Sequence, residues 1–138
     1  IPIPGRAGGV RSLIEAASMQ TLANRMQAEG ESSDHLWEQA EEWRVSQPVL
    51  SAWMDEAAAG LAWATLSAAA LLELSTVVID GWMPPNIRSE IVERTRRALL
   101  QLDLAGVEPP AIRPGTVGAY ARSLGAAAIP LANRYLIA

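Results

Sequence analysis

The 138-residue chain has the length of one ordinary domain, and half of its residues are apolar, which is typical of a folded protein. It has no cysteine and a single histidine, so disulfides, thiolate zinc sites, cysteine nucleophiles and histidine-rich metal clusters are excluded. The net charge of −4 argues against a nucleic-acid surface in this segment. We therefore expect no metal, no cofactor and no catalytic residue set.

The first third of the chain predicts a loop followed by two helices. Residues 1–9 are rich in proline and glycine and are expected to form a loop. Apolar residues then recur at helical spacing from about Ser12 until Gly30 ends the helix. A short acidic helix is expected over residues 35–44, with the side chain of His35 at its start in solvent.

A long helix is expected from Pro48 to about Leu74, because proline is favoured in the first turn of a helix. Residues 57–72 carry no charge, but a membrane-spanning helix needs about 20 apolar residues, and small side chains dominate this stretch. A helix buried on several sides fits better, so we expect no membrane partner and a cytoplasmic location. Trp53 and Trp63, together with the alanine-rich face of this helix, are candidates for contact with a partner subunit.

The next segment predicts a strand, a helix and a second strand. The β-branched run Thr76–Ile79 is typical of a strand covered on both faces, and a short edge strand flanked by prolines is expected at residues 111–113. An amphipathic helix lies between them, so the two strands should be parallel. Two strands alone do not make a stable parallel sheet. Further strands are therefore expected upstream, in an α/β domain of which this chain is the later part.

The last segment predicts a helix that is unusually rich in helix-weakening residues. Thr116 would cap it, and Gly118, Gly125 and Pro130 lie inside it. The small residues form a thin stripe along the helix, which would allow close packing against a sheet. A Gly125→Leu substitution would then overpack the contact and destabilise the fold.

The stretch "VVIDGWMP…IRPGTVGAYARSLGAAAIPL…RYL" resembles the C-terminal part of the ROK family of repressors and sugar kinases, over roughly residues 70–138. The resemblance implies an α/β fold, namely the C-terminal part of an actin-like, ribonuclease-H-like ATPase-type domain that is helix-rich with a few strands. Residues 1–138 would form one C-terminal fragment of such a protein. The upstream half and any DNA-binding domain would lie outside it.

Departures from the family pattern separate two functional interpretations. The kinases usually carry a Gly-Gly pair after the strand, where the backbone approaches the nucleotide, whereas this chain reads Asp80-Gly81-Trp82. The family's zinc-binding histidine and cysteines are also missing here. We therefore favour the effector (sugar)-binding and oligomerisation part of a ROK-type transcriptional regulator. The alternative is the C-terminal half of an ATP-dependent sugar kinase, which would be inactive alone because its phosphate loops and catalytic aspartate lie in the earlier half.

The expected partners follow from the resemblance. A homo-oligomer, most simply a dimer, is implied through this half of the protein, together with a sugar ligand. DNA would be bound only through an N-terminal domain outside this chain.

Three residues are candidates for ligand binding, and each also has a structural interpretation. Asp80 ends a strand, where α/β ligand sites form, but it could instead cap the strand end as a turn residue. Gly81 could approach a phosphate or simply provide backbone conformation. Glu15 corresponds to the family's sugar-binding glutamate only after a one-residue shift, and it could instead be an exposed glutamate favoured by the helix dipole. The structural interpretation is favoured for all three.

Overall fold

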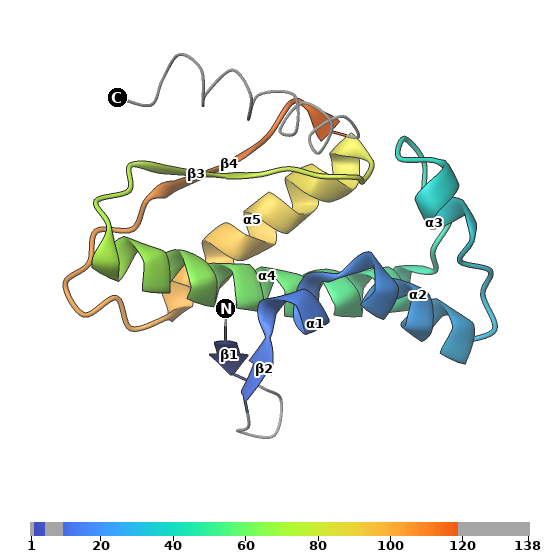
Figure 1. The fold of residues 1–138 in the computed structure, drawn as a ribbon, viewed down its shortest axis with the longest axis horizontal. Helices are drawn as coiled ribbons and strands as arrows, with labels where there is room; N and C mark the ends of the chain where they lie inside the picture. Colours follow the sequence, from blue (N-terminus) through green and yellow to red (C-terminus); the bar gives the residue numbers. More distant parts are fainter. Residues whose placement is uncertain (1, 5–9, 119–138) are drawn as a thin grey trace, which may run out of the picture.

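A computed structural model of the protein describes residues 2–4 and 10–118, and Figure 1 shows the arrangement of the elements. In chain order the elements are β1 (Pro2–Pro4), β2 (Val10–Ser12), α1 (Leu13–Ala17), α2 (Met19–Ala28), α3 (His35–Glu38), α4 (Gln47–Leu71), β3 (Thr76–Ile79), α5 (Pro85–Gln101) and β4 (Ala111–Pro114). The fold is a mixed α/β arrangement, as expected. The predicted last helix, with Gly125 and Pro130, falls outside the described residues.

The long helix α4 is the centre of the packing. Pro48 lies in its first turn, and α5 makes the most extensive contact with it. Figure 1 shows the β3–β4 pair on one side of α4 and the β1–β2 pair on the other. Trp53 of α4 is 2% exposed and its indole donates to the Ser18 carbonyl at 3.1 Å. The expectation that Trp53 contacts a partner subunit is therefore wrong, because the indole is used inside the chain. Trp63 is 37% exposed.

Within residues 2–4 and 10–118, no helix combines the length and the hydropathy needed to cross a bilayer.

The strands β3 and β4 pair in parallel, from Thr76 beside Ala111 to Ile79 beside Pro114, as the strand–helix–strand pattern predicted. The expectation that β3 is covered on both faces is wrong. Ile79 is 9% exposed, whereas Val78 is 60% exposed. Successive side chains of a strand point to opposite faces of the sheet. Helix α5 packs against one face of the β3–β4 pair. Within the described residues, the side chains on the other face therefore remain accessible to solvent.

The first residues differ from the predicted loop and single helix. Pro2–Pro4 is a strand that pairs antiparallel with Val10–Ser12, and Ile3 between the prolines is 4% exposed. Ile3 packs on Gly60 of α4, where an added Cβ would lie 2.8 Å from the Ile3 Cδ1 atom. The burial of one isoleucine outweighs the loop preference of its neighbours. The helix also breaks at Ser18, whose hydroxyl accepts the Thr21 N–H at 3.2 Å and so begins α2 as an N-cap.

The acidic helix is shorter than expected, and its histidine is not in solvent. α3 ends at Glu38, after which Gln39 is extended. His35 is 8% exposed, and its Nε2 accepts the backbone N–H of Arg44 at 2.9 Å. The imidazole thus fixes the returning chain, which brings Trp43 into the core beside Trp53. A hydrogen bond nine residues away along the chain leaves no local sequence pattern, which is why solvent exposure was the wrong prediction.

Candidate functional site

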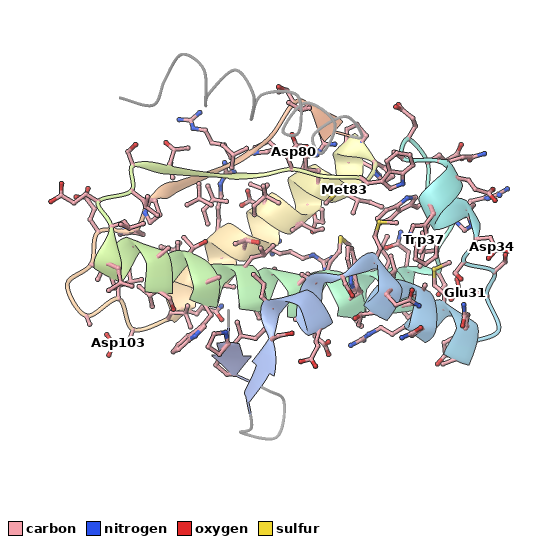
Figure 2. The ribbon with its side chains drawn as sticks, viewed as in Figure 1. Glu31, Asp34, Trp37, Asp80, Met83 and Asp103 are labelled. Carbon is pink, nitrogen blue, oxygen red and sulfur yellow. The ribbon has the colours of Figure 1, made fainter. Side chains whose placement is uncertain are left out.

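The carboxyl ends of the parallel strands meet at one end of the sheet, where ligand sites of α/β folds form. Asp80 follows β3 directly, and Gly115 follows β4. The Gly115 N–H donates to the Ile79 carbonyl at 2.8 Å, so the strand pairing continues up to Asp80. Figure 2 shows Asp80 and Met83 at this end of β3, where α5 begins. The ligand interpretation of Asp80 is therefore decided by what surrounds this strand end.

The Asp80 carboxylate is surrounded by backbone donors. Its Oδ1 accepts the N–H of Gly81 at 2.8 Å and of Gly118 at 3.0 Å, and its Oδ2 accepts the N–H of Val117 at 3.0 Å. The Nε atom of Arg88 lies 3.1 Å from Oδ1 as an ion pair. Burial opposes ionisation of the carboxyl, but the three N–H donors and the Arg88 charge together outweigh it and lower the pKa of Asp80. The carboxylate is thereby held in its ionised form.

Arg88 is the partner that the sequence did not reveal. It is 6% exposed and extends from α5 into the strand end. Its Nη1 donates to the Gly115 carbonyl at 3.1 Å, and its Nη2 donates to the carbonyls of Met83 at 3.2 Å and Gly81 at 3.4 Å. One guanidinium therefore connects the residues after both strands to the first turn of α5.

Glycines make this close approach possible. An added Cβ at Gly115 would overlap the Asp80 carboxylate, and at Gly118 it would lie 2.9 Å from Arg88 Nη2. Gly81 has φ 148° and Gly118 has φ 64°, values that side-chain-bearing residues rarely adopt. The φ of Gly81 fits the conformational interpretation of that residue. The φ of Gly118 is left-handed, so its expected place inside a right-handed helix is wrong.

This geometry favours the capping interpretation of Asp80. A carboxylate has about four acceptor positions, and three amides plus Arg88 already approach it. A ligand hydroxyl would have to compete with these groups for the carboxylate oxygens. Chemically, the arrangement holds a charge in place and crosslinks three segments.

Glu15 occupies a different part of the fold. Its Oε2 accepts the Ser12 N–H at 2.8 Å, and the Ser12 hydroxyl accepts the Glu15 N–H at 3.2 Å. This reciprocal pair is a capping box that begins α1. Figure 1 shows α1 on the side of α4 away from β3. Of the three candidate residues, Asp80 and Gly81 therefore lie at the strand end, whereas Glu15 lies in a separate part of the fold.

Two tryptophan side chains lie near the strand end. The Trp82 indole donates to the Leu36 carbonyl of α3 at 2.7 Å while the residue stays 38% exposed. Trp37, the next residue of α3, is 46% exposed, and Figure 2 shows it beside α3. The turn after β3 is therefore tied to α3, with two accessible tryptophans in adjoining segments.

No protein-family model matches the chain, and no curated protein matches it. Among residues 2–4 and 10–118, no cluster of three or more histidine, aspartate or glutamate side chains could hold a metal ion.

Proposed function

We propose that the chain is the effector (sugar)-binding and oligomerisation part of a ROK-type transcriptional regulator, within an actin-like domain and in the cytoplasm. The proposal rests on the resemblance of residues 70–138 and is supported by how its described segments meet. The segment that follows β3 and the segment that follows β4 converge on Asp80 and Arg88. The described parts of the two sequence stretches that carry the resemblance therefore meet at this strand end.

The observation that favours the regulator over the kinase is the position of Trp82. The resemblance implies that kinases have a second glycine here, so that the backbone can approach a nucleotide. In this chain an indole fills the position and is anchored to the Leu36 carbonyl at 2.7 Å. A nucleotide approaching Gly81 as in the kinases would have to displace a hydrogen-bonded tryptophan.

The sugar contact in this proposal lies at one of two separate places. One is the Asp80–Gly81 turn, where the accessible face of Trp82 offers an apolar surface on which a sugar ring can stack. The other is the Glu15 carboxylate at the start of α1. Because these places do not adjoin, a single monosaccharide cannot use both.

Ligand-induced stabilisation tests the proposal. Thermal unfolding of the chain is followed by tryptophan fluorescence with hexoses, N-acetylhexosamines and their 6-phosphates, each over a concentration series. A sugar that binds the folded state raises the Tm with the logarithm of its concentration once it exceeds Kd. Trp82→Phe should weaken the response if the turn binds the sugar, and Glu15→Gln should weaken it if α1 does. Gln also fits a capping box, so the second variant keeps the fold.

The kinase alternative also predicts no phosphorylation by this chain alone, because its phosphate loops and catalytic aspartate would lie outside it. The chain is incubated with Mg²⁺-ATP and each sugar, and sugar phosphate is measured against a control without sugar. Phosphorylation above that control would contradict both the regulator and an inactive kinase fragment. A flat Tm for every sugar would contradict the effector-binding role.

A further inference from the structure

The chain between α3 and α4 returns to the core with little backbone support. Ala40 is 7% exposed and Trp43 is 9% exposed, so this segment supplies two buried side chains. Among the described residues, the Arg44 N–H is the only backbone group of residues 40–45 that takes part in a hydrogen bond, and its acceptor is His35 Nε2 at 2.9 Å. Apart from side-chain packing, the position of the segment therefore depends on one imidazole nitrogen.

Both ends of the segment are fixed independently of this bond. At its start, the Gln39 N–H donates to the His35 carbonyl at 3.0 Å. At its end, the Ser46 N–H and hydroxyl donate to the Glu31 carboxylate at 2.7 and 2.9 Å. Residues 40–45 can therefore leave the core while the helices on either side stay in place.

The buried position of Trp43 is opposed by its own indole N–H. The ring packs edge-on against Trp53, with ring centroids 6.1 Å apart, but its Nε1–H has no acceptor among the described residues. A buried donor without an acceptor has lost the hydrogen bonds that water would give it. The bond from Arg44 to His35 and the packing of the indole hold the segment against this cost.

The bond from Arg44 to His35 exists only while the imidazole is neutral. An accepting Nε2 places the ring proton on Nδ1, and protonation of the ring turns Nε2 into a second donor. Two donors would then face each other. Histidine is the side chain whose charge ordinarily changes between about pH 5 and pH 8, so this contact is sensitive to a fall in pH.

The groups around His35 favour an imidazolium that turns away from the Arg44 N–H. The histidine borders a cavity of about 490 Å³, whose charged lining residues are Glu31, Asp34, Glu38 and Arg44. Figure 2 shows Glu31 and Asp34 close to α3. Three carboxylates and one guanidinium give the cavity a net negative charge, which attracts a positively charged ring.

We propose that His35 is a pH-sensitive switch, in which protonation of the imidazole breaks its bond with the Arg44 N–H and residues 40–45 leave the core. The ring then turns toward the carboxylates of the cavity, and the Trp43 Nε1–H reaches solvent. Because the open form binds one proton more than the closed form, lowering the pH shifts the population toward the open form. The open form exposes the Trp43 indole together with the part of Trp53 that it covers. This inference goes beyond the proposed function, because it involves neither a sugar nor the strand end.

Solution NMR of the 138-residue chain tests the proposal, since its one histidine gives a single imidazole signal to follow. The protection factor of the Arg44 amide, the ratio of its intrinsic to its observed exchange rate, is measured at about pH 8 and about pH 5, the limits of the range in which histidine changes charge. His35→Gln is the matched variant, because the amide oxygen of glutamine can accept the Arg44 N–H but does not titrate. His35→Phe fills the space without an acceptor. Far-ultraviolet circular dichroism confirms that each variant is folded.

We expect the protection factor of the Arg44 amide to fall at least tenfold between the two pH values in the parent, in step with protonation of the imidazole. It should not change with pH in His35→Gln, and it should be low at both pH values in His35→Phe. The indole N–H of Trp43, identified with Trp43→Phe, should lose protection in the parent over the same pH range. Amides of α4 should stay protected, because the opening is local.

Four results would overturn the proposal. The imidazole could stay neutral down to pH 5, or the Arg44 amide could stay protected after the imidazole has been protonated. A loss of protection shared by His35→Gln would assign the effect to the carboxylates instead of the histidine. Loss of protection throughout α4 at pH 5 would show unfolding of the whole chain in place of a local switch. None of these measurements uses a sugar, so the sugar-dependent Tm tests the effector role separately.

Discussion

Replacing Arg88 with methionine is the sharpest test of the strand-end assembly. The side chain of Arg88 is 8% exposed and that of its ion-pair partner Asp80 is 16% exposed. Methionine preserves the apolar stem but removes the charge and the donors to three carbonyl groups. Breaking a buried ion pair from one side costs about 3–5 kcal/mol. The three amides that still hold Asp80 favour the lower end, so we expect a loss of about 3 kcal/mol, or a Tm lower by on the order of 10 °C.

Urea unfolding followed by tryptophan fluorescence measures this loss, since urea leaves ionic strength unchanged. Asp80→Asn and the double variant complete a thermodynamic cycle, in which contacting residues show coupling of about 0.5–3 kcal/mol. Arg97→Met is the matched control. Its side chain is 62% exposed and lies 3.8 Å from Glu90, and exposed pairs of this kind contribute about 0–1 kcal/mol.

Two results would refute the reasoning. If Arg88→Met lost no more stability than Arg97→Met, the guanidinium would not hold the strand ends together. If the effects of Arg88→Met and Asp80→Asn were additive, the two side chains would act independently despite their 3.1 Å separation.

Three further predictions concern the same fold. The pKa of Asp80 in the folded state is lowered from 3.8, so the contacts of the ionised carboxylate stabilise the fold above that pH and are lost as the pH falls through the lowered pKa. The free energy of unfolding of the parent, measured by urea titration, should therefore approach that of Asp80→Asn progressively below pH 3.8. Gly115→Ala places a methyl group on the Asp80 carboxylate and should destabilise the fold by about 1–3 kcal/mol through overpacking. Gly106→Ala is the control, because Gly106 has a φ of 82° but no atom near the position of an added methyl group, and it should cost less. Equal Tm values for the two variants would contradict the close approach of Gly115 to Asp80. Ser12→Ala removes one half of the capping box with Glu15 and should cost about 1 kcal/mol in urea unfolding, and an unchanged midpoint would mean that the box contributes nothing.

The parts of the fold that the sequence predicted are those whose signals are local. The β-branched run Thr76–Ile79, the proline in the first turn of α4 and the flanking prolines of β4 each mark an element within a few residues of itself. The parts that failed depend on distant partners. His35 is fixed by a bond nine residues away, and Ile3 is buried by a glycine 57 positions later in the chain. Periodicity contains no information about such contacts.

The candidate site shows the same division. Asp80 could be selected from the sequence because carboxylates at strand ends are recurrent in α/β folds. Arg88 could not, because its bond to the Gly115 carbonyl spans 27 residues and depends on the parallel pairing of β3 with β4. Glu15 was selected on resemblance, and its capping role could have been found from the Ser-x-x-Glu spacing with Ser12.

The capping and ligand-binding roles of Asp80 compete for the same oxygen atoms. The Oδ2 atom accepts the Val117 N–H, so a sugar hydroxyl that took this position would release the backbone that follows β4. The free energy of that release would be subtracted from the affinity, and a ligand can shift the conformation only by its differential affinity for the two states. A sugar bound at Asp80 would therefore either be weak or act as a switch on the segment after β4. A sugar bound at Glu15 would cause no such release, and so Val117 amide exchange, measured with and without sugar, separates the two sites.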